Sequence, residues 1–311
     1  MQRVRPRDIV VPGSIANLGP GFDTLGLAVG LYLRLRVRNI EHDGRGRLTW
    51  HFVDGPIGGP NRIADGFRAL GRVKRAPSLE VEVHSEIPLR SGLGSSAAAT
   101  VAGLRLRELV DGRRPGAEIL SAASKIEGHP DNVAPSLFGG VTSCCAMADG
   151  TIRVARWPWP RAWRIVVATP ALELPTPLSR RAIPRRLPVG DAVFNLQRLA
   201  LLLGALQSAN ADDFREALRD RVHQPYRERL VPGLRRLLSV RHPDVIGFCL
   251  SGAGPSIAAF TNGPTAAAER ILKQAYRQER VACTIRALKV HRSSTGLGAV
   301  SSSVARRKGK A

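Results

Sequence analysis

The sequence predicts a protein of two domains, each of which combines strands and helices. The chain has 311 residues, which is more than a single hydrophobic core usually holds. Patterns typical of strands and of helices follow one another along most of its length. Residues 156–161, Arg-Trp-Pro-Trp-Pro-Arg, break the composition near the middle. We therefore expect an N-terminal domain over residues 1–160, a C-terminal domain over 161–297 and a basic, disordered tail over 298–311.

Alternating side chains predict the strands of the N-terminal half. Residues 9–14 form a short apolar strand. In residues 31–38, leucines and a valine face one side while tyrosine and arginines face the other, and residues 79–84 alternate in the same way. If these two strands pair, Glu80 and Glu82 face arginines across the sheet.

Apolar faces that recur every three or four residues predict the helices. In the N-terminal half, these helices cover residues 61–73, 95–110 and 117–126. In the C-terminal half, the expected helices cover 191–209, 212–222 and 266–277, and the expected strands cover 165–168, 245–250, 257–260 and 283–290. Residues 41–60 are polar and glycine-rich and are predicted to be a surface excursion, and the Arg- and Pro-rich residues 176–188 an exposed loop.

A glycine-rich turn joins the strand at 79–84 to the helix at 95–110. Residues 88–99 are Pro-Leu-Arg-Ser-Gly-Leu-Gly-Ser-Ser-Ala-Ala-Ala. Glycines let the backbone approach a ligand, and Ser95 or Ser96 can cap the helix. The free N–H groups and the dipole of a helix start suit a phosphate. The turn is neither the common phosphate-loop pattern nor the dinucleotide fingerprint, so on its own it also fits a plain connection.

Two other segments gather polar side chains between glycines and prolines. In the tight loop at residues 12–28, Asn17 and Asp23 can either bind a ligand or form Asx turns. The segment at residues 127–132 contains Glu127, His129, Asp131 and Asn132. Apolar residues follow this segment directly and should draw it into the core. We therefore expect at least two of these four side chains to act in a cleft.

The net charge of +22 favours anionic ligands. The basic residues are spread along the whole chain with few aromatic neighbours, so we do not expect a nucleic-acid partner. The four cysteines have neither metal-ligand spacing nor a disulfide pattern, which indicates free thiols in a cytoplasmic protein. The N-terminus lacks the apolar core of a signal peptide, and we expect no apolar run long enough to span a membrane.

Three separated blocks match one family. Residues 88–99 contain Pro-x-x-x-Gly-Leu-Gly-Ser-Ser-Ala-Ala, the phosphate loop of the GHMP kinases, at every fixed position. Residues 12–28 and residues 251–256, Ser-Gly-Ala-Gly-Pro-Ser, resemble the first and third motifs of that family. Residues 127–135 and 223–227, His-Gln-Pro-Tyr-Arg, resemble its homoserine kinase branch rather than mevalonate or galactose kinases.

The resemblance covers residues 4–290, and its departures, at Gly13 and Ile15, remove no residue expected to take part in chemistry. It implies an α+β, two-domain GHMP kinase fold. The N-terminal domain would be like domain 2 of ribosomal protein S5, and the C-terminal domain would be ferredoxin-like, with ATP at their junction. The implied reaction is phosphorylation of the side-chain hydroxyl of L-homoserine by ATP and Mg²⁺, a step of threonine biosynthesis. A homodimer is common in such enzymes and is expected here.

By resemblance, the loop that binds ATP consists of Pro88, Leu89, Arg90, Ser91, Gly92, Leu93, Gly94, Ser95, Ser96, Ala97 and Ala98. The residues expected to bind the amino acid are Asn17, Asp23, His129, Asp131, Arg180 and Arg227. Asp23 suits the ammonium group, and the two arginines suit the carboxylate.

The resemblance also implies a metal site and a catalytic pair. Ser96, or in its place Ser95 or Thr100, is expected to hold Mg²⁺ together with Glu127, although the family's metal-binding glutamate can be aligned in more than one way. Asp131 and Asn132 are expected to be catalytic. Whether Asp131 takes a proton or only orients the substrate stays open.

The same residues argue against three other functions. A GHMP kinase of the mevalonate or shikimate type has no reason to set Asp23 and two arginines around a zwitterion. A basic RNA-binding protein with a related N-terminal fold would show steep salt dependence and no ATP turnover. An inactive relative would not need intact Gly94, Ser95, Asp131 and Arg227. The turn at residues 252–254 either closes over the nucleotide or supports the phosphate loop.

Overall fold

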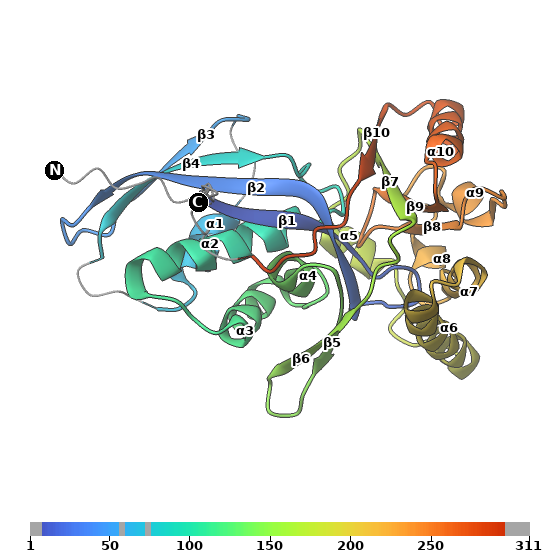
Figure 1. Ribbon diagram of the computed structural model, residues 1–311, viewed down its shortest axis with the longest axis horizontal. Helices are drawn as coiled ribbons and strands as arrows, with labels where there is room; N and C mark the ends of the chain where they lie inside the picture. Colours follow the sequence, from blue (N-terminus) through green and yellow to red (C-terminus); the bar gives the residue numbers. More distant parts are fainter. Residues whose placement is uncertain (1–7, 56–59, 72–75, 296–311) are drawn as a thin grey trace, which may run out of the picture.

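The computed structural model describes residues 8–55, 60–71 and 76–295, which form two lobes side by side (Figure 1). The N-terminal lobe contains β1 (Asp8–Ala16), β2 (Leu25–Glu41), β3 (Leu48–Phe52), β4 (Ser78–Ser85), β5 (Val141–Ala146) and β6 (Ile152–Trp157). The strand order is β3-β4-β2-β5-β6, and β1 pairs with β2. α1 (Arg62–Arg68) carries the chain back between β3 and β4, so these two strands run parallel.

The two predicted alternating strands do pair with each other, since β2 and β4 are antiparallel neighbours. Glu82 accepts a hydrogen bond from Arg38 across the sheet, but Glu80 contacts His51 of β3 instead. The prediction that residues 41–60 are only a surface excursion is therefore wrong. They contain β3, whose alternate side chains pack against the core because this strand pairs with β4.

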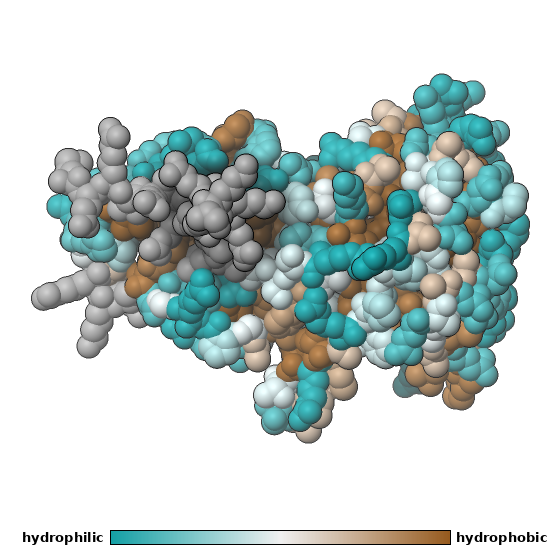
Figure 2. All heavy atoms as spheres, viewed as in Figure 1, coloured by the Kyte–Doolittle hydropathy of each residue, from teal (hydrophilic) through white to brown (hydrophobic). Residues whose placement is uncertain are grey.

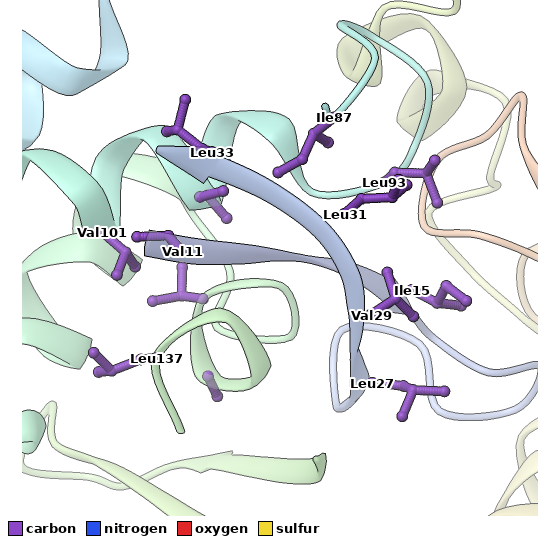
Figure 3. Close-up of a cluster of buried hydrophobic side chains, with 14 of the residues drawn as sticks. Val11, Ile15, Leu27, Val29, Leu31, Leu33, Ile87, Leu93, Val101 and Leu137 are labelled. Carbon is purple, nitrogen blue, oxygen red and sulfur yellow. The ribbon is translucent and has the colours of Figure 1, made fainter. Parts of the chain in front are cut away.

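The core of this lobe lies between the sheet and α2 (Ser95–Asp111), with α3 (Gly116–Glu127) and α4 (Val133–Phe138) beside it (Figure 1). Figure 3 shows Val11 and Ile15 of β1, Leu27, Val29, Leu31 and Leu33 of β2, and Val101 of α2 and Leu137 of α4. Leu93, in the turn before α2, is buried in the same cluster. Burying such a side chain contributes about 2 kcal/mol, which anchors that turn to the core.

The C-terminal lobe contains β7 (Trp163–Pro170), β8 (Gly247–Leu250), β9 (Ile257–Asn262) and β10 (Cys283–Leu288). Its helices are α5 (Thr176–Arg181), α6 (Val189–Ser208), α7 (Ala211–Ala217), α8 (Gln224–Arg227), α9 (Leu234–Ser239) and α10 (Ala266–Gln278). The antiparallel order β10-β7-β9-β8, with helices between β7 and β8 and between β9 and β10, is the expected ferredoxin-like arrangement.

Two predictions in this lobe fail locally. The helix expected over 212–222 ends at Ala217 because Asp220 turns the chain. The carboxylate of Asp220 accepts the backbone N–H groups of Val222, His223 and Gln224. Residues 176–188 are not an exposed loop throughout, since α5 occupies their first part.

The expectation that no apolar run could span a membrane is wrong for α6, which has the length and composition of such a span. The helix is nevertheless engaged in the lobe. Leu202 and Leu206 are buried, and Asn195 donates to Asp220 at 2.7 Å. Its other side is exposed and apolar, and Figure 2 shows hydrophobic residues at the lower right, where Figure 1 draws α6.

The end of the described chain returns to the N-terminal lobe. Val290 bridges to Val29 of β2, Gly140 N donates to His291 O at 2.7 Å, and Thr295 N donates to Leu137 O at 2.8 Å. Residues near 290 therefore pack on the first lobe, although the predicted division assigns them to the second. The boundary at residue 160 stays a prediction, and the tail at 298–311 lies outside the described residues.

Candidate active site

A pocket at the junction of the lobes brings the predicted segments together. It is lined by Asn17, Phe22, Asp23, Arg90, Gly92, Gly94, Ser95, Ser96, Ala97, Glu127, His129, Asp131, Asn132, Leu174, Thr176, Arg180, Arg227, Gly252 and Ala253. These residues come from the β1–β2 loop, the start of α2, the α3–α4 connection, α5, α8 and the β8–β9 turn. Every residue expected to bind the amino acid is among them.

The turn before α2 meets the pocket with its backbone. Gly92 and Gly94 have φ values of 79° and 71°, and a Cβ on Gly94 would lie 2.2 Å from Ser14 Oγ. Gly94 is itself the N-cap, and no side chain caps α2, so the suggested cap by Ser95 or Ser96 is wrong. The N–H groups at the start of α2 are thereby left for an anion.

The predicted phosphate-loop residues divide into two groups. Arg90, Gly92, Gly94, Ser95, Ser96 and Ala97 line the pocket. Pro88 and Leu93 lie on a separate cavity with residues of β7 and β10, Leu89 is exposed, Ser91 donates to Pro88 O, and Ala98 is in the core. This second group shapes the loop and does not face the pocket.

The β8–β9 turn supports this loop from the C-terminal lobe. Ser251 Oγ donates to Gly92 O at 2.7 Å, and Ser256 N donates to Ser91 O at 3.0 Å. A Cβ on Gly92 would lie 2.4 Å from Ser251 O. Of the two roles considered for residues 252–254, these contacts favour support of the phosphate loop.

Glu127 joins α3 to the start of α2. Its Oε1 accepts from Ser96 Oγ at 2.9 Å and from Thr100 Oγ1 at 2.7 Å. Its Oε2 accepts no hydrogen bond from the described residues. Carboxylate and hydroxyl oxygens are the hard donors that Mg²⁺ prefers, so this group fits a magnesium ion beside bound phosphates.

Asp131 is buried at the pocket with one oxygen fully engaged. Oδ1 accepts from His129 Nδ1 at 2.5 Å and from Asn132 Nδ2 at 3.2 Å. Oδ2 takes part in no hydrogen bond across the part of the chain that the structure describes. Burial lowers the pKa of His129, but the hydrogen bond and the charge of Asp131 outweigh it, so the pKa is raised overall. The free oxygen of Asp131 is available to a substrate hydroxyl.

Ser14 is a buried residue of the site that the sequence analysis did not identify. Because Asn132 Nδ2 donates to Asp131, Asn132 Oδ1 must accept the proton of Ser14 Oγ, which lies 2.9 Å away. Ser14 N also donates to Leu93 O at 3.0 Å, which ties the same residue to the phosphate loop. Two signals in the sequence point to it: a lone hydroxyl within an apolar strand, and a place inside residues 12–28, which resemble the first motif of the family.

Asp23 and Arg180 form an ion pair across the pocket. Arg180 donates to both carboxylate oxygens of Asp23, at 2.9 and 2.6 Å. The backbone N–H of Asp23 donates to Asn17 Oδ1, and Asn17 Nδ2 donates to Gly252 O. Asn17 and Asp23 both have positive φ, a cost that is common at functional sites. Asn17 thus holds the loop, although not through an Asx turn, since the N–H that it accepts is six residues further along the chain.

Arg227 is buried at the back of the pocket. Its side chain is enclosed, and Nη1 donates to Gly252 O at 3.0 Å. Burial, together with the charge of Arg180, lowers its pKa to about 10. A guanidinium held this far from water favours an anionic ligand.

The raised pKa of His129 makes its contribution to stability depend on pH. A histidine whose pKa is raised by folding stabilises the folded state when it is protonated. This stabilisation is complete below the ordinary histidine pKa of about 6.5 and is lost as the pH rises through the folded-state pKa. The free energy of unfolding of the wild type should exceed that of His129→Gln by most near pH 5.5, and this difference should shrink toward pH 9. Urea unfolding of both proteins across this range measures the difference, and a difference that grows with pH would contradict the assignment.

Known families and proteins match the chain over both lobes. The GHMP kinases N terminal domain matches residues 61–140, and the GHMP kinases C terminal domain matches residues 202–278. The homoserine kinase of Solibacter usitatus is 44% identical over 257 residues, which are 80% of this chain and 83% of that protein.

Solved structures agree with this match. A crystal structure of homoserine kinase from Cytophaga hutchinsonii has a TM-score of 0.78 at 25% identity and covers 94% of this chain and 97% of that one. A putative homoserine kinase from Listeria monocytogenes has a TM-score of 0.73 at 29% identity, over 93% and 98% of the two chains. With matching family domains, close relatives and a shared two-lobe fold, this chain belongs to the GHMP kinase family and, within it, to the homoserine kinases.

Proposed function

We propose that this chain transfers the γ-phosphoryl group of ATP to the side-chain hydroxyl of L-homoserine, forming O-phospho-L-homoserine for threonine biosynthesis. One observation carries the proposal. A helix start suited to phosphates shares a pocket with Asp131 and with groups of both charges, namely Asp23, Arg180 and Arg227. L-homoserine has a hydroxyl, an ammonium group and a carboxylate, which match these three kinds of group.

Substrate binding exchanges one ion pair for two. In the free pocket Asp23 and Arg180 neutralise each other. The ammonium group of the amino acid takes Asp23, and its carboxylate takes Arg180 and Arg227. The exchange keeps the charge of the pocket balanced, so each desolvated group finds a partner.

Phosphoryl transfer then depends on position and on neutralised charge rather than on covalent help. The N–H groups at the start of α2 hold the phosphates and stabilise the charge that develops on them. The free oxygen of Asp131 accepts a hydrogen bond from the substrate hydroxyl and so directs its oxygen toward the phosphate. Asn132 and His129 hold Asp131 in this orientation.

Ser96, Thr100 and Glu127 are the residues that would hold Mg²⁺, and the ion would supply neutralisation of the phosphate charge. Glu127→Gln should raise the Mg²⁺ concentration needed for half-maximal rate about tenfold or more. Glu118→Gln, on the same helix but paired with Arg114 at the surface, is the matched control. Superimposable Mg²⁺ titrations of Glu127→Gln and wild type would rule out this metal site.

ADP release tests the reaction itself. The wild type should release ADP with L-homoserine and not with mevalonate or shikimate. Asp131→Asn should lower kcat by about 10² to 10⁴. Asp23→Ala and Arg227→Ala should raise the KM for the amino acid far more than the KM for ATP. An amino-acid dependence that is unchanged in both of the last two variants would refute the pocket assignment.

We also propose that the enzyme is a homodimer joined through α6. Val189, Val193 and Leu196 form an apolar stripe on this helix and are 79%, 44% and 66% exposed. The stripe carries no charged side chain, which suits a second copy of itself better than a charged partner. The wild type should have twice the chain mass in size-exclusion chromatography with light scattering. Leu196→Glu should be monomeric and the adjacent Gln197→Glu dimeric; a monomeric wild type would contradict the proposal.

We also propose that the enzyme is cytoplasmic and has neither a membrane nor a nucleic-acid partner. All four cysteines are free thiols, as expected in a reducing compartment. Arginines on the outer face of β2, such as Arg36 and Arg38, are engaged by Asp8 and Glu82. Cell fractionation should recover the activity without membranes, and activity in the membrane fraction would contradict this assignment.

A further inference from the structure

His223 is a buried histidine that the mechanism above does not use. The residue is fully enclosed, and its ring stacks on Phe22 with centroids 5.4 Å apart. Nε2 lies 2.7 Å from Gly19 O, and Nδ1 lies 3.1 Å from Arg227 Nη1. The ring therefore connects the β1–β2 loop, which lines the pocket, to the guanidinium expected to bind the substrate carboxylate.

The hydrogen bonds of Arg227 leave one end of its guanidinium for a ligand. Nε donates to Ser179 O at 3.3 Å, and Nη1 donates both to Gly252 O and to His223 Nδ1. Nη2 donates to nothing within residues 8–55, 60–71 and 76–295, and Arg227 lines the pocket. Because the guanidinium is planar with N–H groups in a fixed fork, fixing Nε and Nη1 also fixes the direction of Nη2.

The contact with Arg227 determines the charge and the tautomer of His223. Arginine has no acceptor, so Nδ1 must accept, and the proton lies on Nε2, which donates to Gly19 O. Asp220 Oδ2 is 3.6 Å from Nε2 and accepts backbone N–H groups of His223 and Gln224 instead. The ring is therefore neutral.

The charges around the ring agree with this neutral form. Burial is the largest cause and lowers the pKa of His223; Asp220 raises it, Arg227 lowers it and Asp23 raises it, so that the net direction is down. Protonation would turn Nδ1 into a donor that points at the guanidinium. It would break the hydrogen bond to Arg227 and set two cations side by side without a shield of water.

We propose that neutral His223 is a positioning residue that directs Nη2 of Arg227 at the carboxylate of the amino acid. The inference rests on the proposed function and deepens it, because it explains how the site selects a substrate with a carboxylate. His223 does not touch the substrate; it acts through Arg227. Only an acceptor at the position of Nδ1 is needed for this role.

Two substitutions of His223 test the two ring nitrogens one at a time, because each keeps the hydrogen-bonding group of one nitrogen and removes that of the other. His223→Asn keeps an oxygen acceptor near the position of Nδ1, whereas His223→Gln keeps an N–H donor near the position of Nε2. We expect His223→Gln to raise the KM for L-homoserine about tenfold, with the KM for ATP little changed. His223→Asn should stay near the wild-type KM. His291→Gln, which changes a histidine outside the pocket, is the control and should leave both KM values unchanged.

The pH profile gives a second readout that a purely structural role would not move. Because the pKa of His223 is lowered from its ordinary value of about 6.5, the ring loses its neutral form only below that pH, and any effect of its protonation on the wild-type KM for L-homoserine should be a rise toward acidic pH. His223→Asn should lack this part of the rise, while any contribution of His129 stays common to both proteins.

The outcomes that overturn the inference differ from those that overturn the function. Equal KM values for His223→Gln and wild type, or an equal loss in His223→Asn and His223→Gln, would refute the role of His223 even though L-homoserine is phosphorylated. A wild type that releases no ADP with L-homoserine refutes the function instead. If neither variant folds, as judged by circular dichroism, a wild-type KM for L-homoserine that falls rather than rises as the pH is lowered below about 6.5 would refute the inference.

Discussion

The close contact of the phosphate loop with backbone on both of its sides is the constraint on which the site depends. Ser14 N in β1 donates to Leu93 O, and Ser251 Oγ beyond β8 donates to Gly92 O. On these two sides, a Cβ on Gly92 would lie 2.4 Å from Ser251 O, and a Cβ on Gly94 would lie 2.2 Å from Ser14 Oγ, so there is room for neither. This turn is thereby one of the places where the lobes are joined. It helps to set the distance from the helix start, which belongs to one lobe, to Arg180 and Arg227, which belong to the other.

The balance of charge within the pocket is the second condition on which the site depends. Three guanidinium groups, those of Arg90, Arg180 and Arg227, line the pocket. That of Arg227 is fully buried, and isolated burial of such a group is costly. Asp23 meets part of this cost by pairing with Arg180. Backbone carbonyls and a neutral imidazole solvate Arg227 without neutralising it. An anionic group of the substrate is then the missing partner, so affinity and selectivity have the same physical origin.

Much of the fold and of the candidate site could be predicted from the sequence, for reasons that differ among the elements. The pairing of β2 with β4 follows from strict alternation, and the helix start follows from glycine density before an Ala-rich run. β3 was missed although its residues alternate, because the strand has only five residues and lies within the polar, glycine-rich residues 41–60. The end of α7 at Ala217 depends on a single carboxylate, Asp220, whose capping of the next turn no periodicity reveals.

The residues that escaped prediction at the site share a further property, which is that they act through another residue. Ser14 holds Asn132, which holds Asp131, and His223 holds Arg227. Both Ser14 and His223 lie inside blocks that resemble the family, at residues 12–28 and 223–227, but within those blocks only charged residues and residues beside glycines indicate a role toward the substrate. The supporting hydroxyl of Ser14 is 118 residues from Asn132 in the sequence, whereas the imidazole of His223 is four residues from Arg227, just before α8. Their function is orientation, and orientation becomes visible only when donors and acceptors are counted in three dimensions. A phosphoryl-transfer site relies chiefly on position, so these inconspicuous contacts carry a large part of what the site can do.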